Sequence, residues 1–252
     1  MVSPAMGPRT NCRWWSGPAE SYREGMPTAI VTGASRGLGL ALTRALLQRG
    51  WRVVVDARDG NALDRAVGAL TGVLSLPGDV SEPGHRAALV EAAGENIDLL
   101  VNNASLLGPS PQPALADYRL SDLARVYDVN VFAPLCLTQL ALPHLAPGAT
   151  VLNITSDAAV EPYEGWGGYG SSKAALEQLT AIFGAEHPAL RVYAVDPGDM
   201  RTQMHQEAFP GEDISDRPLP ETAVPGLLAL ARGEHPSGRY RVPVAVAPAG
   251  VA

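Results

Sequence analysis

The sequence has few residues that could anchor a disulfide framework or a metal site. Its 252 residues include two cysteines, Cys12 and Cys136, and five histidines. The histidines show no spacing typical of metal ligands, and two cysteines fit a reducing cytoplasm. We therefore expect a cytoplasmic protein that holds no metal ion.

Long apolar runs and positive charge are also scarce. We find no run of about 20 apolar residues, the length that a membrane-spanning helix needs. The chain carries 26 acidic and 19 basic side chains, a formal net charge of −7, which argues against nucleic acid or an anionic membrane as the main partner. Residues 1–26 are rich in Pro, Gly and Arg and lack the apolar centre of a signal peptide. We expect them to be a disordered extension, or a segment upstream of a functional start near Met26.

The remaining residues, 27–252, alternate strand and helix patterns over a length that suits one domain. We predict strands at 28–32, 52–57, 73–77, 98–102, 149–155 and 191–195, and a last strand near 240–246. The helical patterns between them include a long stretch at 121–145, which contains Pro134 and Pro143, and a helix at 169–186. This alternation predicts an α/β fold class, a Rossmann-type doubly wound parallel sheet with helices on both faces.

A glycine-rich loop directly follows the first predicted strand and leads into a helical pattern. Its spacing is Gly33-x-x-x-Gly37-x-Gly39. Glycines let the backbone approach a phosphate closely, and the free N–H groups of a helix's first turn point at it. A tight turn would explain the loop alone, but dinucleotide binding is the interpretation that we favour.

Tyr169 and Lys173 are four residues apart on a predicted helix and therefore share one face. A free phenol has a pKa of about 10. A neighbouring ammonium favours the phenolate, so we expect Lys173 to draw the pKa of Tyr169 toward neutrality, where it can transfer a proton. A surface pair would give the same spacing, so the pair needs other motifs beside it.

Four motifs stand in one order: Thr32-Gly-x-x-x-Gly-x-Gly39, Asn102-Asn-Ala-Ser105, Ser156 and Tyr169-x-x-x-Lys173. Together they resemble the short-chain dehydrogenase/reductase family, and the likeness runs over residues 28–246. The family usually has a glycine where this chain has Ser105.

The resemblance implies a reversible hydride transfer between a nicotinamide cofactor and a carbonyl or secondary alcohol. Tyr169 would be the acid/base, Lys173 would lower its pKa and bind the nicotinamide ribose, and Ser156 would donate to the substrate oxygen. Asn130 matches the family's asparagine that holds a water. The cofactor would contact Gly33, Ser35, Arg36, Gly37, Leu38, Gly39, Arg58, Asp79, Val80, Asn103, Ala104, Tyr169, Lys173, Pro197, Gly198 and Thr202. The alternative is a catalytically silent protein of this fold that binds a dinucleotide as a sensor or interaction partner.

The end of the second predicted strand favours NADP(H) over NAD(H). The position where the family usually carries the ribose-binding acid falls on Ala57, and Arg58 follows it. Arg58 and Arg36 could clamp a 2′-phosphate from two sides. Asp56 should point away because side chains alternate along a strand, although a shift of one residue in register would reverse this prediction.

The segment 199–225 is polar, rich in proline and long for a connection, so we expect a lid over the ligand crevice, with a solvated insertion as the alternative. Five apolar residues could line a substrate pocket or pack in the core: Leu106, Leu107, Trp166, Met200 and Met204. The substrate would be a small molecule that the sequence does not name. Ala174, Ala175 and Ala181 leave room for a second helix, and the family commonly pairs this helix, which predicts a homodimer or homotetramer.

Overall fold

The computed structural model describes residues 25–242. In this part of the chain seven strands form one sheet in the order β3-β2-β1-β4-β5-β6-β7, and every neighbouring pair is parallel. The strands are β1 Thr28–Val31, β2 Arg52–Ala57, β3 Val73–Pro77, β4 Ile97–Asn102, β5 Leu145–Ile154, β6 Arg191–Asp196 and β7 Gly238–Arg241. The predicted Rossmann-type doubly wound sheet is confirmed.

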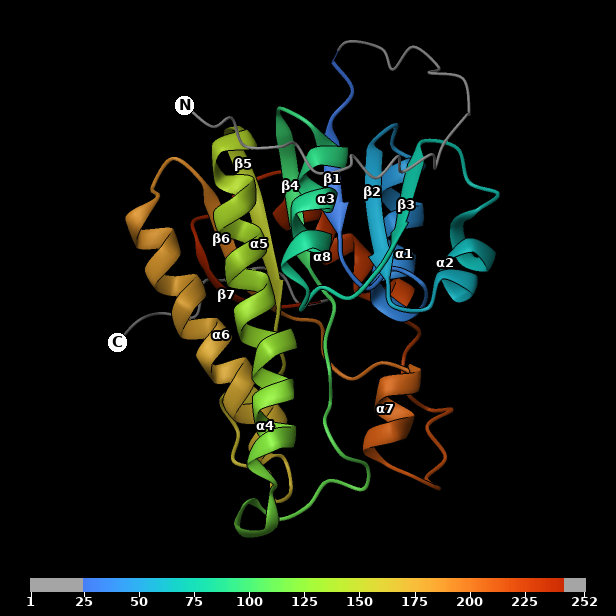
Figure 1. Ribbon diagram of the computed structural model, residues 1–252, viewed down its shortest axis with the longest axis vertical. Helices are drawn as coiled ribbons and strands as arrows, with labels where there is room; N and C mark the ends of the chain where they lie inside the picture. Colours follow the sequence, from blue (N-terminus) through green and yellow to red (C-terminus); the bar gives the residue numbers. More distant parts are fainter. Residues whose placement is uncertain (1–24, 243–252) are drawn as a thin grey trace, which may run out of the picture.

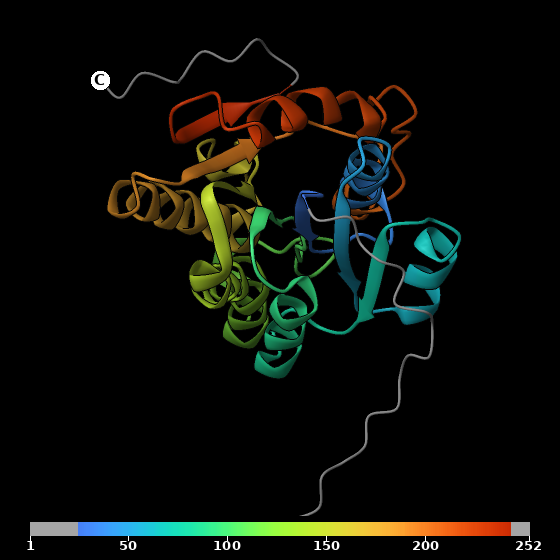
Figure 2. The same ribbon diagram turned by 90° about the horizontal axis from the view of Figure 1, so that it is seen from above.

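Helices cover both faces of this sheet, as Figures 1 and 2 show. The helices are α1 Gly37–Leu47, α2 Gly60–Val67, α3 Pro83–Ala93, α4 Leu120–Tyr127, α5 Ala133–Ala141, α6 Gly167–Glu186, α7 Gln203–Ala208 and α8 Val224–Ala231. Helices α1 and α8 pack together on one face, and α3 and α5 pack together on the other. Short α7 lies apart from both layers (Figure 1).

The strands are buried on both sides because their side chains alternate between two apolar cores. Val53 and Val55 of β2 point into the core beneath α1 and α8. Val54, between them, points into the core beneath α3 and α5. A continuous valine run is therefore what this sheet requires, since burying each such side chain contributes about 1.5–3 kcal/mol.

The order of the strands creates the place for a ligand. Strand β1 lies between β2 and β4, so the loops after β1 and β4 leave the sheet in different directions. In open α/β sheets such a switch point forms a crevice at the carboxyl ends of the strands. The hydroxyl of Thr32, just after β1, accepts the backbone N–H groups of Asn103 and Ala104, each at 3.0 Å, which fixes the two loops against one another.

Three predicted elements have wrong bounds. Strand β5 begins at Leu145, four residues before the predicted start at 149. The predicted helix 121–145 is divided into α4, a five-residue π-helical turn at Asp128–Phe132, α5, and a 3₁₀ turn at Leu142–His144. Pro134 fits because it lies in the first turn of α5, where its missing N–H costs little. The last strand begins at Gly238, two residues before the prediction, and its predicted end lies outside the described residues, as does most of the 1–26 extension.

No helix within residues 25–242 combines the length and the apolar character that a membrane crossing would require.

Candidate active site

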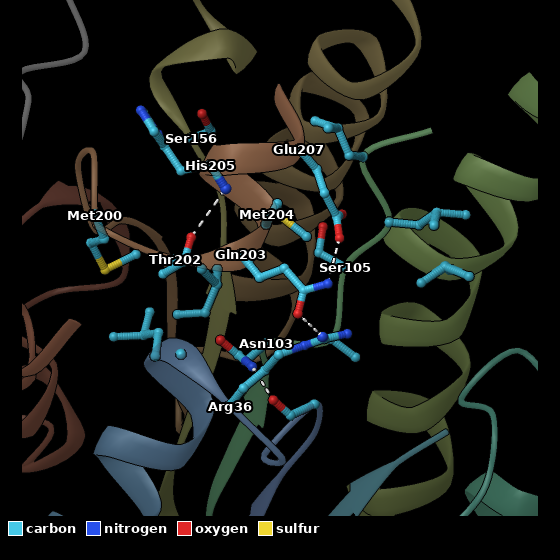
Figure 3. Close-up of a pocket in the computed structure, with 18 of the residues that line it drawn as sticks. Arg36, Asn103, Ser105, Ser156, Met200, Thr202, Gln203, Met204, His205 and Glu207 are labelled. Atoms are coloured by element: carbon cyan, nitrogen blue, oxygen red, sulfur yellow. Dashed lines mark hydrogen bonds between the residues drawn. The ribbon is translucent and has the colours of Figure 1, made fainter. Parts of the chain in front are cut away.

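A cavity of about 680 Å³ runs along the carboxyl ends of the strands. In Figure 3 Arg36 and Asn103 lie toward one end of it, and Ser156 and His205 lie toward the other. Most of the predicted site residues line this cavity: Gly33, Ser35, Arg36, Gly37, Leu38, Arg58, Asp79, Val80, Asn103, Ala104, Ser156, Tyr169, Lys173, Pro197, Gly198 and Thr202. Gly39 and Asn130 are not among its lining residues. Each contacts residues that are: Gly39 lies against Gly33, and Asn130 bonds to Ser105 and Leu106.

The glycine loop is built by close backbone contacts. Gly33 has a φ of +70°, a region that favours glycine, and a Cβ there would lie 2.9 Å from Ala104 Cα. A Cβ on Gly39 would lie 2.5 Å from the carbonyl oxygen of Gly33. Gly39 therefore packs the first turn of α1 against the loop. That turn carries no acidic side chain, so its free N–H groups suit a pyrophosphate.

Asp56, at the end of β2, is used to hold the glycine loop. Its Oδ1 accepts the backbone N–H of Gly33 at 2.7 Å, and its Oδ2 lies 3.0 Å from His85 Nε2. The side chain is 1% exposed. Gly78 makes room for this histidine, since a Cβ there would lie 2.2 Å from His85 Nδ1. Each carboxylate oxygen thus has one partner in the protein, and sequence reasoning gave no signal for His85. Asp56 also lines the cavity, so the prediction that it points away from the ligand site is wrong.

The two predicted arginines have different surroundings. Arg58 is exposed and, within residues 25–242, has no ion-pair partner. The guanidinium of Arg36 donates a hydrogen bond to Gln203 Oε1, and Gln203 Nε2 donates to Glu207 Oε1 at 2.7 Å. Figure 3 shows this chain of bonds, which connects the glycine loop to α7.

Asp79, the predicted adenine contact, hydrogen-bonds to Arg125 and to the backbone and hydroxyl of Ser81. Burial works to raise the pKa of Asp79, but these bonds outweigh it and lower the pKa below its ordinary value.

Tyr169 and Lys173 lie on α6, with 8% and 2% of their surfaces exposed. Lys173 Nζ donates to the carbonyl oxygen of Ile154 at 2.8 Å and lies 5.5 Å from the centre of the Tyr169 ring. Lys173 is the chain's single lysine beside 18 arginines, as its 19 basic side chains are counted from the sequence.

The prediction that Lys173 lowers the pKa of Tyr169 is wrong for these residues by themselves. Burial raises the pKa of Tyr169 to about 12, although the neighbouring Ser105 and Ser156 hydroxyls lower it in part. Burial also lowers the pKa of Lys173 to about 7, against the attraction of Glu177. The same burial that disfavours the phenolate thus also disfavours the ammonium of Lys173, which weakens the expected effect on the phenol.

Ser156 follows β5 and begins a 3₁₀ turn. Its Oγ donates to Asp157 Oδ1 at 2.9 Å and accepts the backbone N–H of Ala158 at 3.2 Å. These bonds hold the hydroxyl beside Tyr169, where both residues line the cavity.

Asn130 is fully buried in the π-helical turn, so it is not a surface asparagine. Its Nδ2 donates to the Leu106 carbonyl and to Ser172 Oγ, both at 2.9 Å. Its Oδ1 accepts the Leu106 N–H at 2.8 Å and the Ser105 hydroxyl at 3.2 Å. Such turns often occur at functional sites, and here the turn connects α6 to the loop after β4.

Part of the cavity lining is apolar and aromatic. Leu106, Leu107, Trp166, Met200 and Met204 all line it, and the ring centre of Trp166 lies 5.8 Å from that of Tyr169 and 5.9 Å from that of Phe209. Sequence reasoning missed Gln203, His205 and Glu207, which also line the cavity, because nothing in the spacing of the 199–225 segment marked a helix there.

Comparisons with known proteins show the family to which the chain belongs. A family model described as short chain dehydrogenase matches residues 27–213. The chain is 34% identical to a benzil reductase of Saccharomyces cerevisiae that forms (S)-benzoin, over 71% of this chain and 73% of that protein. It is 33% identical to the sepiapterin reductase of Meriones unguiculatus, over 75% of this chain and 80% of that protein.

A solved structure of similar fold is an alcohol dehydrogenase from the archaeon Thermococcus sibiricus in complex with 5-hydroxy-NADP. It has a TM-score of 0.76 and 25% identity, covering 86% of this chain and 96% of that chain. The protein is an α/β oxidoreductase with a Rossmann-like sheet. It belongs to the short-chain dehydrogenase family.

Proposed function

We propose that this protein reduces a ketone with NADPH, with Tyr169 as the proton donor. The observation that carries the proposal is the convergence of Ser156, Tyr169 and Lys173 at one end of a cavity whose other end is a glycine loop. A nicotinamide dinucleotide held along this cavity supplies the hydride. The reduction direction is supported by the similarity to benzil and sepiapterin reductases.

In this mechanism the hydride goes to the carbonyl carbon and the Tyr169 hydroxyl gives its proton to the carbonyl oxygen. Ser156 donates to the same oxygen and stabilises the charge that develops on it. A buried phenol with a pKa of about 12 stays protonated at neutral pH, so it is ready to act as an acid. Lys173 favours the phenolate that remains after the transfer.

The preference for NADPH rests on charge at the end of β2. Asp56 at the end of β2 already bonds Gly33 and His85, which supports a role in holding the loop. Arg58, which is exposed, and Arg36, whose guanidinium also bonds Gln203, would offer two guanidiniums to a 2′-phosphate. The NADP complex of the Thermococcus relative agrees with this choice.

The segment 199–225 is proposed as a lid. Met204 and Ala208 of α7 pack against the cluster of Leu107, Ala158 and Tyr169, and the Ser110 hydroxyl donates to the Glu207 carbonyl oxygen at 2.6 Å. The segment thus contacts the loop after β4 across the cavity. Excluding water there would strengthen the electrostatic effects at the reacting oxygen.

A homodimer or homotetramer is proposed through α5 and α6. Phe132, just before α5, and Ile182 on α6 are 52% and 44% exposed, although they are large and apolar. A second copy of the chain could cover them.

The experiment that tests the proposed reaction follows NADPH oxidation with a panel of diketones, aryl ketones and quinones. Tyr169→Phe should lower kcat/KM by about 10²–10⁴-fold and leave NADPH affinity unchanged. Unchanged turnover in this variant would contradict the mechanism. Tight NADPH binding with no turnover across the panel would favour the alternative of a sensor.

A further inference from the structure

The last described strand, β7, carries two arginines on one face of the sheet. Arg241 is the partner of Asp196 across β7 and β6, so these two side chains lie on the same face. Arg239 comes two residues earlier and shares that face, because side chains alternate along a strand. The guanidiniums of Arg239 and Arg241 lie 3.6 Å and 3.5 Å from Asp196 Oδ2. Helix α6 packs against both strands, and Figure 1 shows the three elements together.

Arg239 joins α6 to the segment that follows β5. Its Nε donates to Glu177 Oε1 on α6 at 2.9 Å, and its Nη2 donates to the backbone carbonyl of Ser156 at 3.4 Å. Glu177 Oε1 also accepts the Thr155 hydroxyl at 2.8 Å. The ion pair of Arg239 and Glu177 therefore holds two consecutive residues after β5. Their side chains are only 28% and 14% exposed, so water and salt screen the pair less than they screen a surface pair.

We propose that Arg239 is a positioning residue for the reaction, which fixes the main chain of Ser156 so that its hydroxyl meets the substrate oxygen. The hydroxyl is already oriented within its own 3₁₀ turn by the two bonds described above. Arg239 adds a link between that turn and α6, the helix that carries Tyr169. Glu177 lies about two helical turns after Tyr169. The link thus sets the two groups that bind the reacting oxygen relative to one another.

This inference rests on the proposed function, in which Ser156 donates to the reacting oxygen. A misplacement of about 1 Å at a catalytic group can cost about 100-fold in rate. The bond from Arg239 to the Ser156 carbonyl is long, so we expect a smaller loss, of about 10-fold. Because the charge on the reacting oxygen develops in the transition state, the loss should fall on kcat and leave KM unchanged.

The test compares Arg239→Met and Arg239→Lys with the wild type and with Arg241→Met by following NADPH oxidation. Both Arg239 variants should lower kcat by about 10-fold with unchanged NADPH affinity. The lysine keeps a positive charge beside Glu177, which protects the fold, but its compact ammonium lacks the fork of donors that also reaches the Ser156 carbonyl. Arg241→Met removes the other charge that faces Asp196 and no bond to Ser156, so it should keep the wild-type kcat. Wild-type kcat in Arg239→Lys would overturn the proposal.

A double-mutant cycle separates positioning from general structural support. In the Ser156→Ala background the hydroxyl that Arg239 places is already absent. Arg239→Lys should therefore lower kcat much less in that background than in the wild type. An equal loss in both backgrounds would overturn the proposal, because Arg239 would then act by a route that does not include the Ser156 hydroxyl.

Hydrogen exchange gives a measurement that does not depend on turnover. The backbone N–H of Ala159 donates to the Ser156 carbonyl at 3.1 Å, and that of Ala158 donates to Ser156 Oγ at 3.2 Å, so both report the order of this turn. Their protection should fall in the Arg239 variants and stay unchanged in Arg241→Met. A wild type without turnover but with this loss of protection would overturn the proposed reaction and keep the link. Unchanged protection together with unchanged kcat would overturn the link itself.

Discussion

The backbone N–H of Gly33 donates a hydrogen bond to Asp56 Oδ1 at 2.7 Å. This bond joins the first residue of the glycine loop to the end of β2, and Ala34 adds a second link through its N–H to the Asp56 carbonyl at 2.8 Å. The carboxylate nearest to the expected adenosine ribose is therefore part of the loop's support. We therefore propose that the arginines around it set the cofactor preference.

Arg58→Ala should reduce the preference for NADPH. The exposed guanidinium has only a 2′-phosphate to recognise, so its loss should lower kcat/KM for NADPH by about 10-fold or more, the cost of about one charge-assisted hydrogen bond. The value for NADH should stay unchanged. Arg65→Ala, on the exposed side of α2 and away from the cavity, is the matched control. A wild type that prefers NADH would show that Asp56 serves the ribose after all.

Gly39→Ala should prevent cofactor binding and destabilise the fold. The new Cβ would lie 2.5 Å from the Gly33 carbonyl oxygen and 2.6 Å from Asn103 Nδ2, so the glycine loop would have to shift. Gly84→Ala in α3 is the control, because a Cβ there meets nothing within 4 Å. It should stabilise the protein by up to about 1 kcal/mol. Thermal melts measure the stability of each variant, and NADPH titration measures its cofactor binding. Equal melting temperatures in the two variants would contradict the conclusion that the loop has no room for a Cβ at Gly39.

Lys173→Met should stabilise the protein and abolish turnover. Burial lowers the pKa of Lys173 from 10.5 to about 7, so between these values the unfolded chain binds a proton that the folded chain does not. The destabilisation of the folded protein by this lysine is therefore greatest below about pH 7. It disappears as the pH rises toward 10.5. We expect a gain of about 1–3 kcal/mol at pH 7, less than the full pKa difference implies, because the bond to Ile154 is lost too.

Denaturant unfolding at several pH values checks the Lys173 prediction. The gain of the methionine variant should shrink between pH 7 and pH 10. A gain that is the same at every pH would mean that packing, and not the titration of the lysine, is responsible.

Ile182→Arg should convert the proposed oligomer to a monomer. Ile182 is 44% exposed on α6, and a charge in an apolar interface would be left unpaired. Leu120→Arg is the control, since Leu120 is 79% exposed at the start of α4. Light scattering at micromolar concentration should show a monomer for Ile182→Arg and the wild-type oligomer for Leu120→Arg. A wild type that is already monomeric would contradict the proposal.

The sequence predicted the sheet and most of the cavity lining because these depend on local patterns. Apolar runs specify strands, and residues that follow parallel strands meet at one edge of the sheet. Ser156, Tyr169 and Lys173 could thus be brought together without knowing any contact between them.

What could not be predicted depends on contacts between distant residues. The pairing of His85 with Asp56 and of Arg36 with Gln203 follows from packing, and no spacing encodes it. The pKa of Tyr169 was misjudged for the same reason. The helical spacing indicated that Lys173 is a neighbour of Tyr169. How strongly burial raises the pKa of Tyr169 depends on the fold, which the spacing does not show.

Lys173 has a consequence for chemical labelling. It is the one lysine of the chain, so an amine-directed reagent has a single side-chain target, and that target lies in the cavity with a pKa of about 7. An acylating reagent small enough to enter should modify this position at neutral pH, where ordinary lysines are protonated and slow. One mass increment on a peptide containing residue 173 would then report directly how open the cavity is, and its decrease with added NADPH would measure occupancy without any substrate.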